Sequence, residues 1–243
     1  MQTTKILVPV RVLEGESLPE GIPELLANTH VVLLGYHVVP EQTTPGQMQM
    51  QFESQAQNRL DELEELLESA GATVETQLVF TRDGQKTIDR VIYEHGCLAV
   101  LDPDAVGRIE NVLVPIRGTV GLDRIARVVS GLFADTDVKV TLYHITEEGE
   151  SNEDARTLLD GLVARLAEQG IGPKRITLTI RHGGKPLDSI TETAELFDVV
   201  VIGESDPSIA TFVFGLPADK VAERFLGPVF VVQRERPGGD AHD

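Results

Sequence analysis

A short apolar segment with an internal proline and a trailing arginine occurs twice in the chain, as ILVPVR at 6–11 and as VLVPIR at 112–117. Two further matches follow in the same order: Tyr36-His37-Val38 with Tyr143-His144-Ile145, and a pattern Arg-x-Gly-x-Lys at 82–86 and at 181–185. Three matches in one order indicate a duplicated unit. We therefore predict two domains, at 1–108 and 109–235, and a disordered tail at 236–243.

Each unit shows strands alternating with helices. The predicted strands are 5–10, 30–38, 73–80 and 97–101 in the first unit, and 111–116, 137–145, 175–180 and 198–202 in the second. The predicted helices are 14–27, which Gly and Pro interrupt, Phe52–Ala70 and one from Ile88, then one carrying Leu122 to Leu132, 153–168 and one from Leu187. Continuous apolar runs stopped by proline are typical of strands buried on both faces of a parallel sheet. The predicted fold class is α/β, as two tandem doubly wound, Rossmann-like domains.

The two units differ at their ends. The second continues from Gly203 through a predicted helix at 216–226 to a fifth strand at 228–232. In the first, residues 103–110 alone separate the fourth strand from the next unit. The first domain is therefore predicted to lack its last helix and strand.

The charge excludes some partners. The chain has 39 acidic and 21 basic residues, for a net charge of −18. Such a chain repels phosphate backbones and anionic membranes, so we expect neither nucleic acid binding nor membrane insertion. An acidic surface that is poor in lysine suits a solvent of high ionic strength. A salt-adapted host and an ordinary acidic protein are both consistent with this composition.

The single cysteine, Cys97, lies in an apolar run, which excludes an intrachain disulfide and a cysteine metal cluster and predicts a buried thiol. No basic leader with an apolar segment begins the chain, and no apolar stretch approaches the length of a membrane span. We expect a cytoplasmic protein.

The segment Val199-Val-Val-Ile202-Gly203, together with 215–232 and its ending Pro228-Val-Phe-Val-Val, resembles the universal stress protein family. The resemblance covers essentially the whole chain as a tandem pair. It implies the adenine nucleotide α-hydrolase-like fold, a stress-response role and pairing through terminal strands. Nucleotide-binding members have an aspartate after the first strand and a loop Gly-x-x-Gly, nine residues, Gly-Ser/Thr. The pocket that the resemblance implies is formed here by Pro115, Ile116, Arg117, Ile145, Gly203, Ser205 and Gly215.

Four departures from that pattern argue against ATP binding in the family's usual manner. Arg11 and Arg117 stand where the aspartate is expected and replace an acceptor with a donor-only cation. Asp206 replaces the second glycine of the loop, where phosphate needs bare backbone. Eight residues rather than nine precede Gly215, and Leu216 follows it. We expect no cofactor, with ATP or another adenine nucleotide as the alternative.

The two arginines allow two interpretations. They could form a bidentate anion site beside Gly203 and the helix after Gly215. They could instead pair with local acids such as Glu14, Glu204 or Asp206, which we favour because ion pairs between exposed charges are common.

Other chemistry-bearing residues do not predict catalysis or metal binding. His37 and His144 follow the second strands and could respond to pH, but we favour hydrogen-bonded structural histidines, without metal partners at ligand spacing. The basic segment 181–185 lacks the Gly-Lys-Ser/Thr of a phosphate loop and predicts a helix-entry turn before Pro186. No Ser-His-Asp order or carboxylate pair stands out, so we expect no enzyme.

These features predict a regulatory or stress-response module that acts by binding. We expect a homodimer formed through the open edge at 228–232. Two alternatives remain: a nucleotide or anion sensor that uses the loop of the second domain, and the soluble regulatory domain of an amino-acid or ion transporter.

Overall fold

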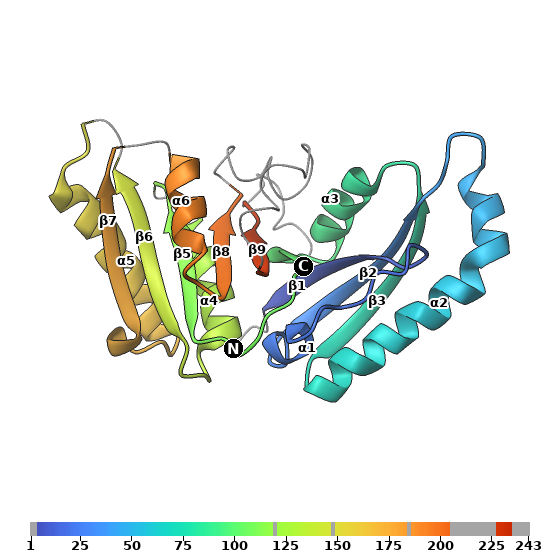
Figure 1. Cartoon of the computed structure of the whole chain (residues 1–243), viewed down its shortest axis with the longest axis horizontal. Helices are drawn as coiled ribbons and strands as arrows, with labels where there is room; N and C mark the ends of the chain where they lie inside the picture. The colour runs from blue at the N-terminus through green and yellow to red at the C-terminus, as the bar shows by residue number, and fades with distance from the viewer. Residues whose placement is uncertain (1–3, 119–120, 147–148, 184–185, 205–226, 235–243) are drawn as a thin grey trace, which may run out of the picture. The chain divides into compact units, whose positions relative to one another are not determined.

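The structure is a computed structural model of the chain, and it describes residues 4–118, 121–146, 149–183, 186–204 and 227–234. The chain divides into two compact units (Figure 1). Unit 1 comprises Met1–Arg108 and Leu226–Val229, and unit 2 comprises Ile109–Phe225 and Phe230–Asp243. Each unit is described by itself.

Unit 1 is built on a parallel sheet with the strand order β3-β2-β1-β4. Its elements are β1 (Lys5–Arg11), α1 (Ile22–Leu25), β2 (His30–Val38), α2 (Pro45–Ala70), β3 (Thr73–Thr81), α3 (Gly84–Glu94) and β4 (Ala99–Asp102). The chain moves outward from β1 to β3 and then returns to β4 on the other side of β1. Right-handed crossovers in both directions therefore place α2 and α3 on opposite faces of the sheet.

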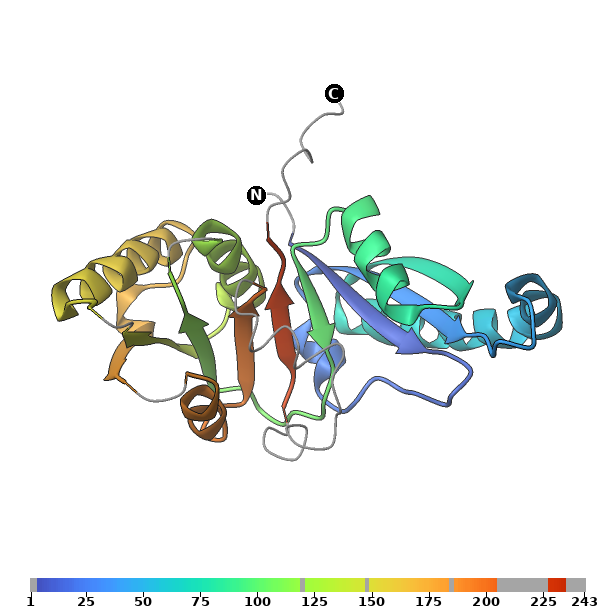
Figure 2. The same cartoon turned by 90° about the horizontal axis from the view of Figure 1, so that it is seen from above.

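Unit 2 repeats this order, with strands arranged β9-β8-β5-β6-β7. Its elements are β5 (Asn111–Ile116), α4 (Leu122–Phe133), β6 (Lys139–Thr146), α5 (Asn152–Glu168), the 3-10 turn η1 (Pro173–Arg175), β7 (Ile176–His182), α6 (Pro186–Ala194), β8 (Val199–Gly203) and β9 (Val229–Val232). β5 pairs in parallel with β6 and β8, and β6 pairs in parallel with β7. Figure 2 shows α4 and α5 on one face of these strands and α6 on the other.

The apolar segments that repeat in the sequence are the central strands β1 and β5. Ile6, Leu7 and Val8 have no exposed surface, and neither do their counterparts in β5. A strand buried on both faces must be apolar at every position, which explains the continuous apolar run. The predicted doubly wound α/β fold is confirmed.

The repeated proline was predicted to stop the apolar run, but in the structure it lies inside the strand. Pro9 pairs with Leu34, and β1 continues to Arg11; Pro115 pairs with Tyr143, and β5 continues to Ile116. Among the described pairs, Ile6 and Leu7 are the residues of β1 that pair with β4, so Pro9 lies two residues beyond the last paired position. β5 and β8 repeat this arrangement. Because proline has no backbone N–H, no N–H group is left without a partner at the point where the neighbouring strand departs.

Helix starts differ most from expectation. α2 begins at Pro45, seven residues before Phe52, because a capping box precedes it. The Thr44 hydroxyl accepts a hydrogen bond from the backbone N–H of Gln47, and the Gln47 side-chain oxygen accepts one from the backbone N–H of Thr44. α3 begins at Gly84 rather than Ile88, because Asp83 caps it.

The other ends agree better. Segment 14–27 keeps a single helical turn, α1, as its glycines and proline suggested. Gly71 ends α2 with a φ of 109°, as predicted. The fifth strand of unit 2 is present as β9, and the predicted helix at 216–226 lies outside the described residues.

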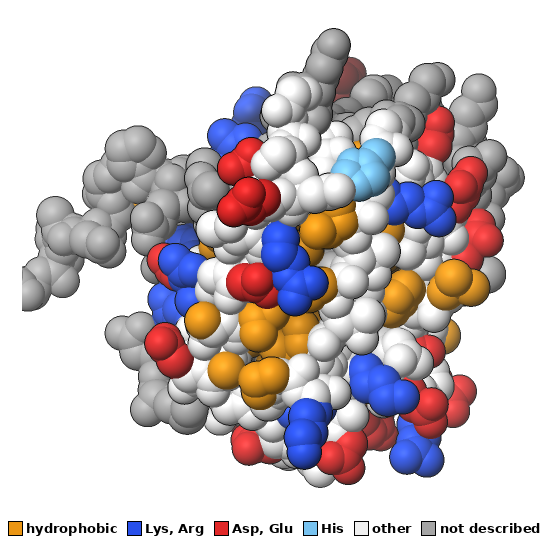
Figure 3. All heavy atoms as spheres, turned by 90° about the vertical axis from the view of Figure 1, so that its left-hand side faces the viewer, with side chains coloured by type: hydrophobic (Ala, Val, Ile, Leu, Met, Phe, Trp, Pro, Cys, Tyr) orange, Lys and Arg blue, Asp and Glu red, His pale blue; other side chains and the backbone are white. Residues whose placement is uncertain are grey.

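β3 and β7 are the outermost strands of their units. On β7, Ile176, Leu178 and Ile180 are half-buried, whereas Arg181 and His182 are exposed. Figure 3 views this side of unit 2 and shows hydrophobic, basic and acidic side chains lying close together. No helix among the described residues has the length and apolar character that crossing a bilayer requires.

One arginine joins three segments of unit 2. The Arg175 guanidinium donates to the carbonyl oxygens of Phe133 at 2.6 Å, Ala134 at 3.2 Å and Val138 at 3.0 Å. It thus binds the last carbonyls of α4, which have no partners within the helix, and links them to the start of β7.

We predict that Arg175→Ala lowers the free energy of unfolding by about 2–3 kcal/mol, because several carbonyls lose a charged donor. Arg175→Lys is expected to recover only part of this loss, since an ammonium cannot reproduce the planar fork. Urea unfolding followed by circular dichroism measures both. Arg181→Ala is the control and should change stability by less than about 0.5 kcal/mol, because this side chain is exposed.

Candidate functional site

In parallel α/β sheets, ligands bind beyond the carboxyl ends of the strands, beside the point where the strand order reverses. In unit 1 this point lies after β1 and β4, and in unit 2 it lies after β5 and β8. Arg11 and Arg117 stand at these ends, as do the candidate pocket residues Ile116 and Gly203.

Arg11 ends β1 and is engaged by its own unit. Its Nε donates to the Tyr36 hydroxyl at 3.2 Å, and its Nη1 lies 3.3 Å from a Glu14 carboxylate oxygen. Its backbone N–H donates to Glu16 at 2.7 Å. The hydrogen bond that Arg11 donates to Tyr36, with the charge of Glu14, raises the pKa of Arg11. The predicted pairing of Arg11 with Glu14 is confirmed.

Acidic side chains surround the same strand end. Asp102 ends β4, and partial loss of hydration together with Asp104 and Glu16 raises its pKa to about 6. Loss of hydration is the largest cause of this rise, and the two neighbouring carboxylates add to it.

Unit 1 fills the space beside β2 with apolar groups. A Cβ added at Gly35 would lie 2.9 Å from a methyl carbon of Val12 and 3.0 Å from one of Leu60. Val12 directly follows β1, and Leu60 lies on α2. The two side chains therefore close this position to anything larger than glycine.

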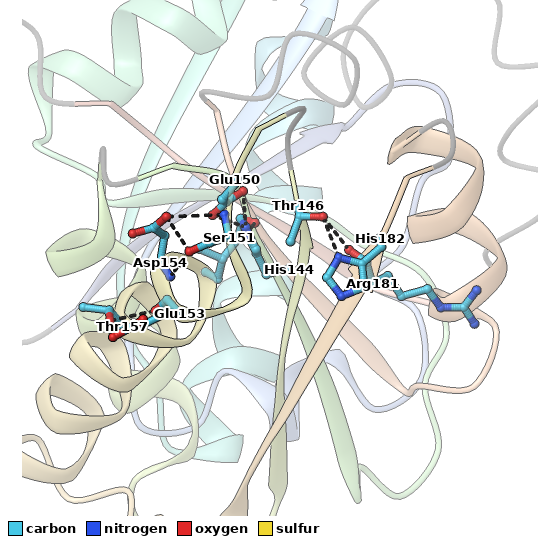
Figure 4. A network of polar contacts seen from close by, with 10 residues as sticks. His144, Thr146, Glu150, Ser151, Glu153, Asp154, Thr157, Arg181 and His182 are labelled. Carbon is cyan, nitrogen blue, oxygen red and sulfur yellow. Dashed lines mark hydrogen bonds and ion pairs between the residues drawn. The ribbon is translucent and has the colours of Figure 1, made fainter.

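Unit 2 places a polar pair at the corresponding position. His144 is 2% exposed, with Nδ1 2.8 Å from the carbonyl oxygen of Ile116 and Nε2 2.9 and 3.0 Å from the two carboxylate oxygens of Glu150 (Figure 4). A carbonyl oxygen only accepts, so Nδ1 carries a proton. The contact with Glu150 then requires a second proton, on Nε2 or on the carboxyl group. The pair joins the end of β5 to the start of α5.

The two histidines are not equivalent, contrary to the match of Tyr36-His37 with Tyr143-His144. Pro9 pairs with Leu34 but Pro115 pairs with Tyr143, so Gly35 takes the place of His144 in unit 1. Three more residues separate the paired positions in unit 2, which changes the register. A hydrogen-bonded histidine is confirmed for His144.

His37 differs from His144 in its contacts. Its ring packs edge-on against Phe80 at 6.2 Å between ring centroids. Its Nδ1 is buried without a hydrogen-bond partner.

The candidate pocket residues of unit 2 are only partly gathered. Pro115, Ile116 and Ile145 are buried at the ends of β5 and β6. Arg117 is half-buried and is not a free cation. Gly203 ends the neighbouring strand β8. The remaining positions, Ser205, Asp206, Gly215 and Leu216, lie outside the described residues.

Glu204 was a candidate partner for Arg117, and its described hydrogen bonds lead to the last strand. Its backbone N–H donates to Val232 at 2.7 Å, and its carboxylate accepts from the backbone N–H of Arg234 at 2.8 Å. Arg124 donates to the carbonyl oxygens of Gln233 and Arg234. The end of β9 is thus bound to β8 and α4.

The basic segment at the end of β7 does not form an anion site among its described residues. His182 Nδ1 lies 3.0 Å from the Thr146 hydroxyl, and that hydroxyl also lies 3.3 Å from the Arg181 carbonyl oxygen (Figure 4). Arg181 and His182 end β7, and α6 begins at Pro186. No group of acidic, histidine or cysteine side chains suited to a metal ion occurs in the described part of the chain.

Sequence reasoning missed Glu150, Val12 and Leu60. Glu150 directly precedes the capping box of Ser151 and Asp154, which fixes the start of α5 at Asn152. That capping signal was readable and could have found Glu150. Nothing in the sequence pattern indicated that Val12 and Leu60 meet at Gly35.

No protein-family model and no curated protein matches the chain. Several solved structures do match. A universal stress protein from Archaeoglobus fulgidus DSM 4304 has a TM-score of 0.66 and 17% identity, over 96% of this chain and 97% of that one. A protein named for that family from Pseudomonas aeruginosa UCBPP-PA14 has a TM-score of 0.51 and 17% identity, over 96% and 94%. A functionally unknown protein from Pseudomonas aeruginosa PAO1 has a TM-score of 0.51 and 18% identity, over 96% and 93%.

These matches confirm the predicted resemblance at the level of the fold: the chain has the universal stress protein fold along nearly its whole length.

We predict that Glu150→Ala and His144→Ala each lower the free energy of unfolding by about 2 kcal/mol, because each leaves a buried polar partner unpaired. The loss of unfolding free energy in the double variant should be smaller than the sum of the two single losses by about 1–2 kcal/mol, because residues in contact have coupled effects on stability. Urea unfolding of the four proteins measures this coupling. The exposed pair Arg156 and Asp160 on α5 is the control, with an expected coupling below about 0.5 kcal/mol.

The pKa of Asp102 predicts a pH-dependent effect. The pKa of about 6 in the folded protein exceeds the ordinary aspartate pKa of 3.8. The stability contributed by the protonated group is therefore complete below pH 3.8 and is lost as the pH rises through about 6. Asp102→Asn should therefore raise the urea midpoint at about pH 8 and leave it unchanged at about pH 4. Solvent screening limits the gain, since the side chain is partly exposed. Glu20→Gln, at an exposed site, should show no such difference between the two pH values.

Proposed function

We propose that this chain is a regulatory or stress-response module that acts by binding and does not hold ATP in the usual manner of nucleotide-binding universal stress proteins. The supporting observation is that protein side chains already occupy the strand ends where such a ligand would lie. Val12 and Leu60 close the position at Gly35 in unit 1. His144 and Glu150 bond to each other at the matching position in unit 2.

The charge at the end of β1 supports the same proposal. Arg11 is the cation there, and Tyr36, Glu14 and Glu16 already engage it. A nucleotide phosphate would have to displace these partners and approach Asp102, whose pKa is raised first by loss of hydration and then by Asp104 and Glu16. Like charges in this arrangement disfavour phosphate binding.

Unit 2 supports a second candidate, an anion or altered-nucleotide sensor. Arg117 directly follows β5, and His144 lies near the end of β6 on one side of it, whereas Gly203 ends β8 on the other side. An anion would exchange with the present partners of these groups, and Ser205 and Gly215 would complete the site. Binding would then loosen the contact of His144 with Glu150 and move the start of α5.

A homodimer formed through the edge at 228–232 remains part of the proposal. The side chains of Phe230, Val231 and Val232 on this strand are at most 2% exposed, so pairing there would use the backbone of β9. No feature of the described residues favours a regulatory domain of a transporter over a homodimeric module.

We titrate the chain with ATP, ADP, AMP, cyclic AMP and phosphate by calorimetry and thermal shift, and we expect no saturable response up to about 1 mM. A dissociation constant of about 1 mM corresponds to a binding free energy of about −4 kcal/mol. Binding of ATP with micromolar affinity would overturn the proposal. Phosphate binding alone, abolished by Arg117→Ala and unaffected by Arg11→Ala, would select the sensor candidate. The second variant is the matched control, because it changes the repeated arginine in the other unit.

A further inference from the structure

The strand β7 has a backbone edge that no described strand pairs with. It is the outermost strand of unit 2, and its described partner is β6 on the inner side. The seven residues Ile176–His182 span roughly 20 Å at the usual rise of a strand. Such an edge presents backbone N–H and C=O groups at the spacing of another extended peptide, so it is a template for an added strand.

The middle of β7 has none of the charges that often protect an edge strand. Residues 176–180 are Ile, Thr, Leu, Thr and Ile, and the β-branched residues among them favour extended structure. Ile176, Leu178 and Ile180 are half-buried, and they alternate with Thr177 and Thr179. Residues two apart lie on one face of a strand. An added strand would therefore meet an apolar row on one face and hydroxyl groups on the other.

The charges that flank this strand have the opposite sign to that of the whole chain. Residues 169–187 contain no Asp or Glu, although the protein has a net charge of −18. Lys174 lies in the turn η1 before β7, Arg181 and His182 end the strand, and all three side chains are exposed. Figure 3 shows this side of unit 2, where hydrophobic side chains lie beside basic ones, with acidic side chains around them.

The corresponding edge strand of unit 1, β3, is not basic. Residues 70–86, which contain β3, include two acidic and two basic residues. Glu75 lies on β3, and its carboxylate is 3.5, 3.5 and 3.0 Å from nitrogen atoms of Lys5, His30 and His95. The same position in the fold thus has balanced charge in unit 1, so the fold does not require the basic edge of unit 2.

We propose that the outer edge of β7 binds an extended acidic segment of another protein, which adds to the sheet as a strand. Backbone hydrogen bonds hold the added strand, and its apolar side chains pack beside Leu178. Acidic side chains near its two ends meet Lys174 and Arg181. This surface goes beyond the proposed function, because it does not depend on whether the carboxyl ends of the strands hold a ligand.

Backbone geometry and charge together select this occupant. A nucleic acid or a membrane can attract the cations, but neither has the alternating donors and acceptors that match a strand edge. A second copy of β7 has the matching backbone. Antiparallel pairing of two such strands would, however, bring Lys174 of each copy toward Arg181 of the other, and like charges facing each other across strands are destabilising. An acidic segment satisfies both the backbone and the cations.

Fluorescence anisotropy of the full chain with a labelled peptide tests the proposal. The peptide has about ten residues, with alternating Val and Thr between pairs of Glu, to match the strand length. We expect saturable binding with a dissociation constant on the order of 10 μM at low salt, which weakens as salt screens the charges. A peptide with Lys in place of Glu should not bind measurably.

A charge-reversed pair of variants assigns the binding to this edge. Lys174→Glu with Arg181→Glu should weaken binding of the acidic peptide by about tenfold or more. The matched control is Lys86→Glu with Arg90→Glu, which changes the net charge equally at exposed positions of α3. It should weaken binding by less than about threefold, since it acts only through the overall field. Circular dichroism checks that each variant is folded.

N-methylation of alternate residues of the peptide tests the backbone contact separately from charge. It removes N–H donors without changing the charge, so we expect binding to weaken by about tenfold or more in at least one of the two alternate patterns. Absence of binding by the acidic peptide would overturn the proposal. So would binding that both N-methylated peptides retain, an equal loss in the α3 control, or displacement of the peptide by single-stranded RNA or anionic vesicles.

Discussion

The pairing of the central strand with only part of its neighbour sets the geometry of each unit. β1 is paired with β2 along its full length but with β4 at two residues, and β5 has the same relation to β6 and β8. A backbone N–H facing the departing strand would lose its partner in a dry interior. Pro9 and Pro115 have no such group, so each strand can continue to the end where a ligand would bind. The repeated proline therefore belongs to the fold itself and says nothing about the ligand.

The two units have the same backbone arrangement but fill its carboxyl edge in opposite ways. In unit 1 the residue beside the end of β1 is Gly35, and Val12 and Leu60 pack over it. In unit 2 it is His144, whose two ring nitrogens find hydrogen-bond partners in Ile116 and Glu150. Apolar packing cannot exchange for a ligand without loss of core contacts, whereas a polar pair can. The second unit is for this reason the better place for a regulated site.

Apolar periodicity and turn residues predicted the helices and strands well. The sequence could not predict which residues of neighbouring strands pair with each other. The capping residues Thr44 and Gln47 were readable but were overlooked, because the apolar stripe of α2 becomes prominent only near Phe52. The equivalence of Gly35 and His144 depends on how many residues the preceding loop and helix consume, which no local pattern records. The arginine at the end of β1 was correctly assigned to Glu14, since those residues are close in sequence. The contact of Val12 with Leu60 joins distant segments.

Charge is arranged along the strands of unit 1 in the opposite sense to that of an anion-binding fold. At the amino ends, Lys5 and His95 lie 3.5 and 3.0 Å from Glu75, and although partial desolvation opposes them they lower the pKa of that carboxyl group. At the carboxyl ends, acids gather around Arg11, and Asp102 resists ionisation. A phosphate arriving there would compete with side chains that the chain itself holds in place, so the exchange gains little free energy.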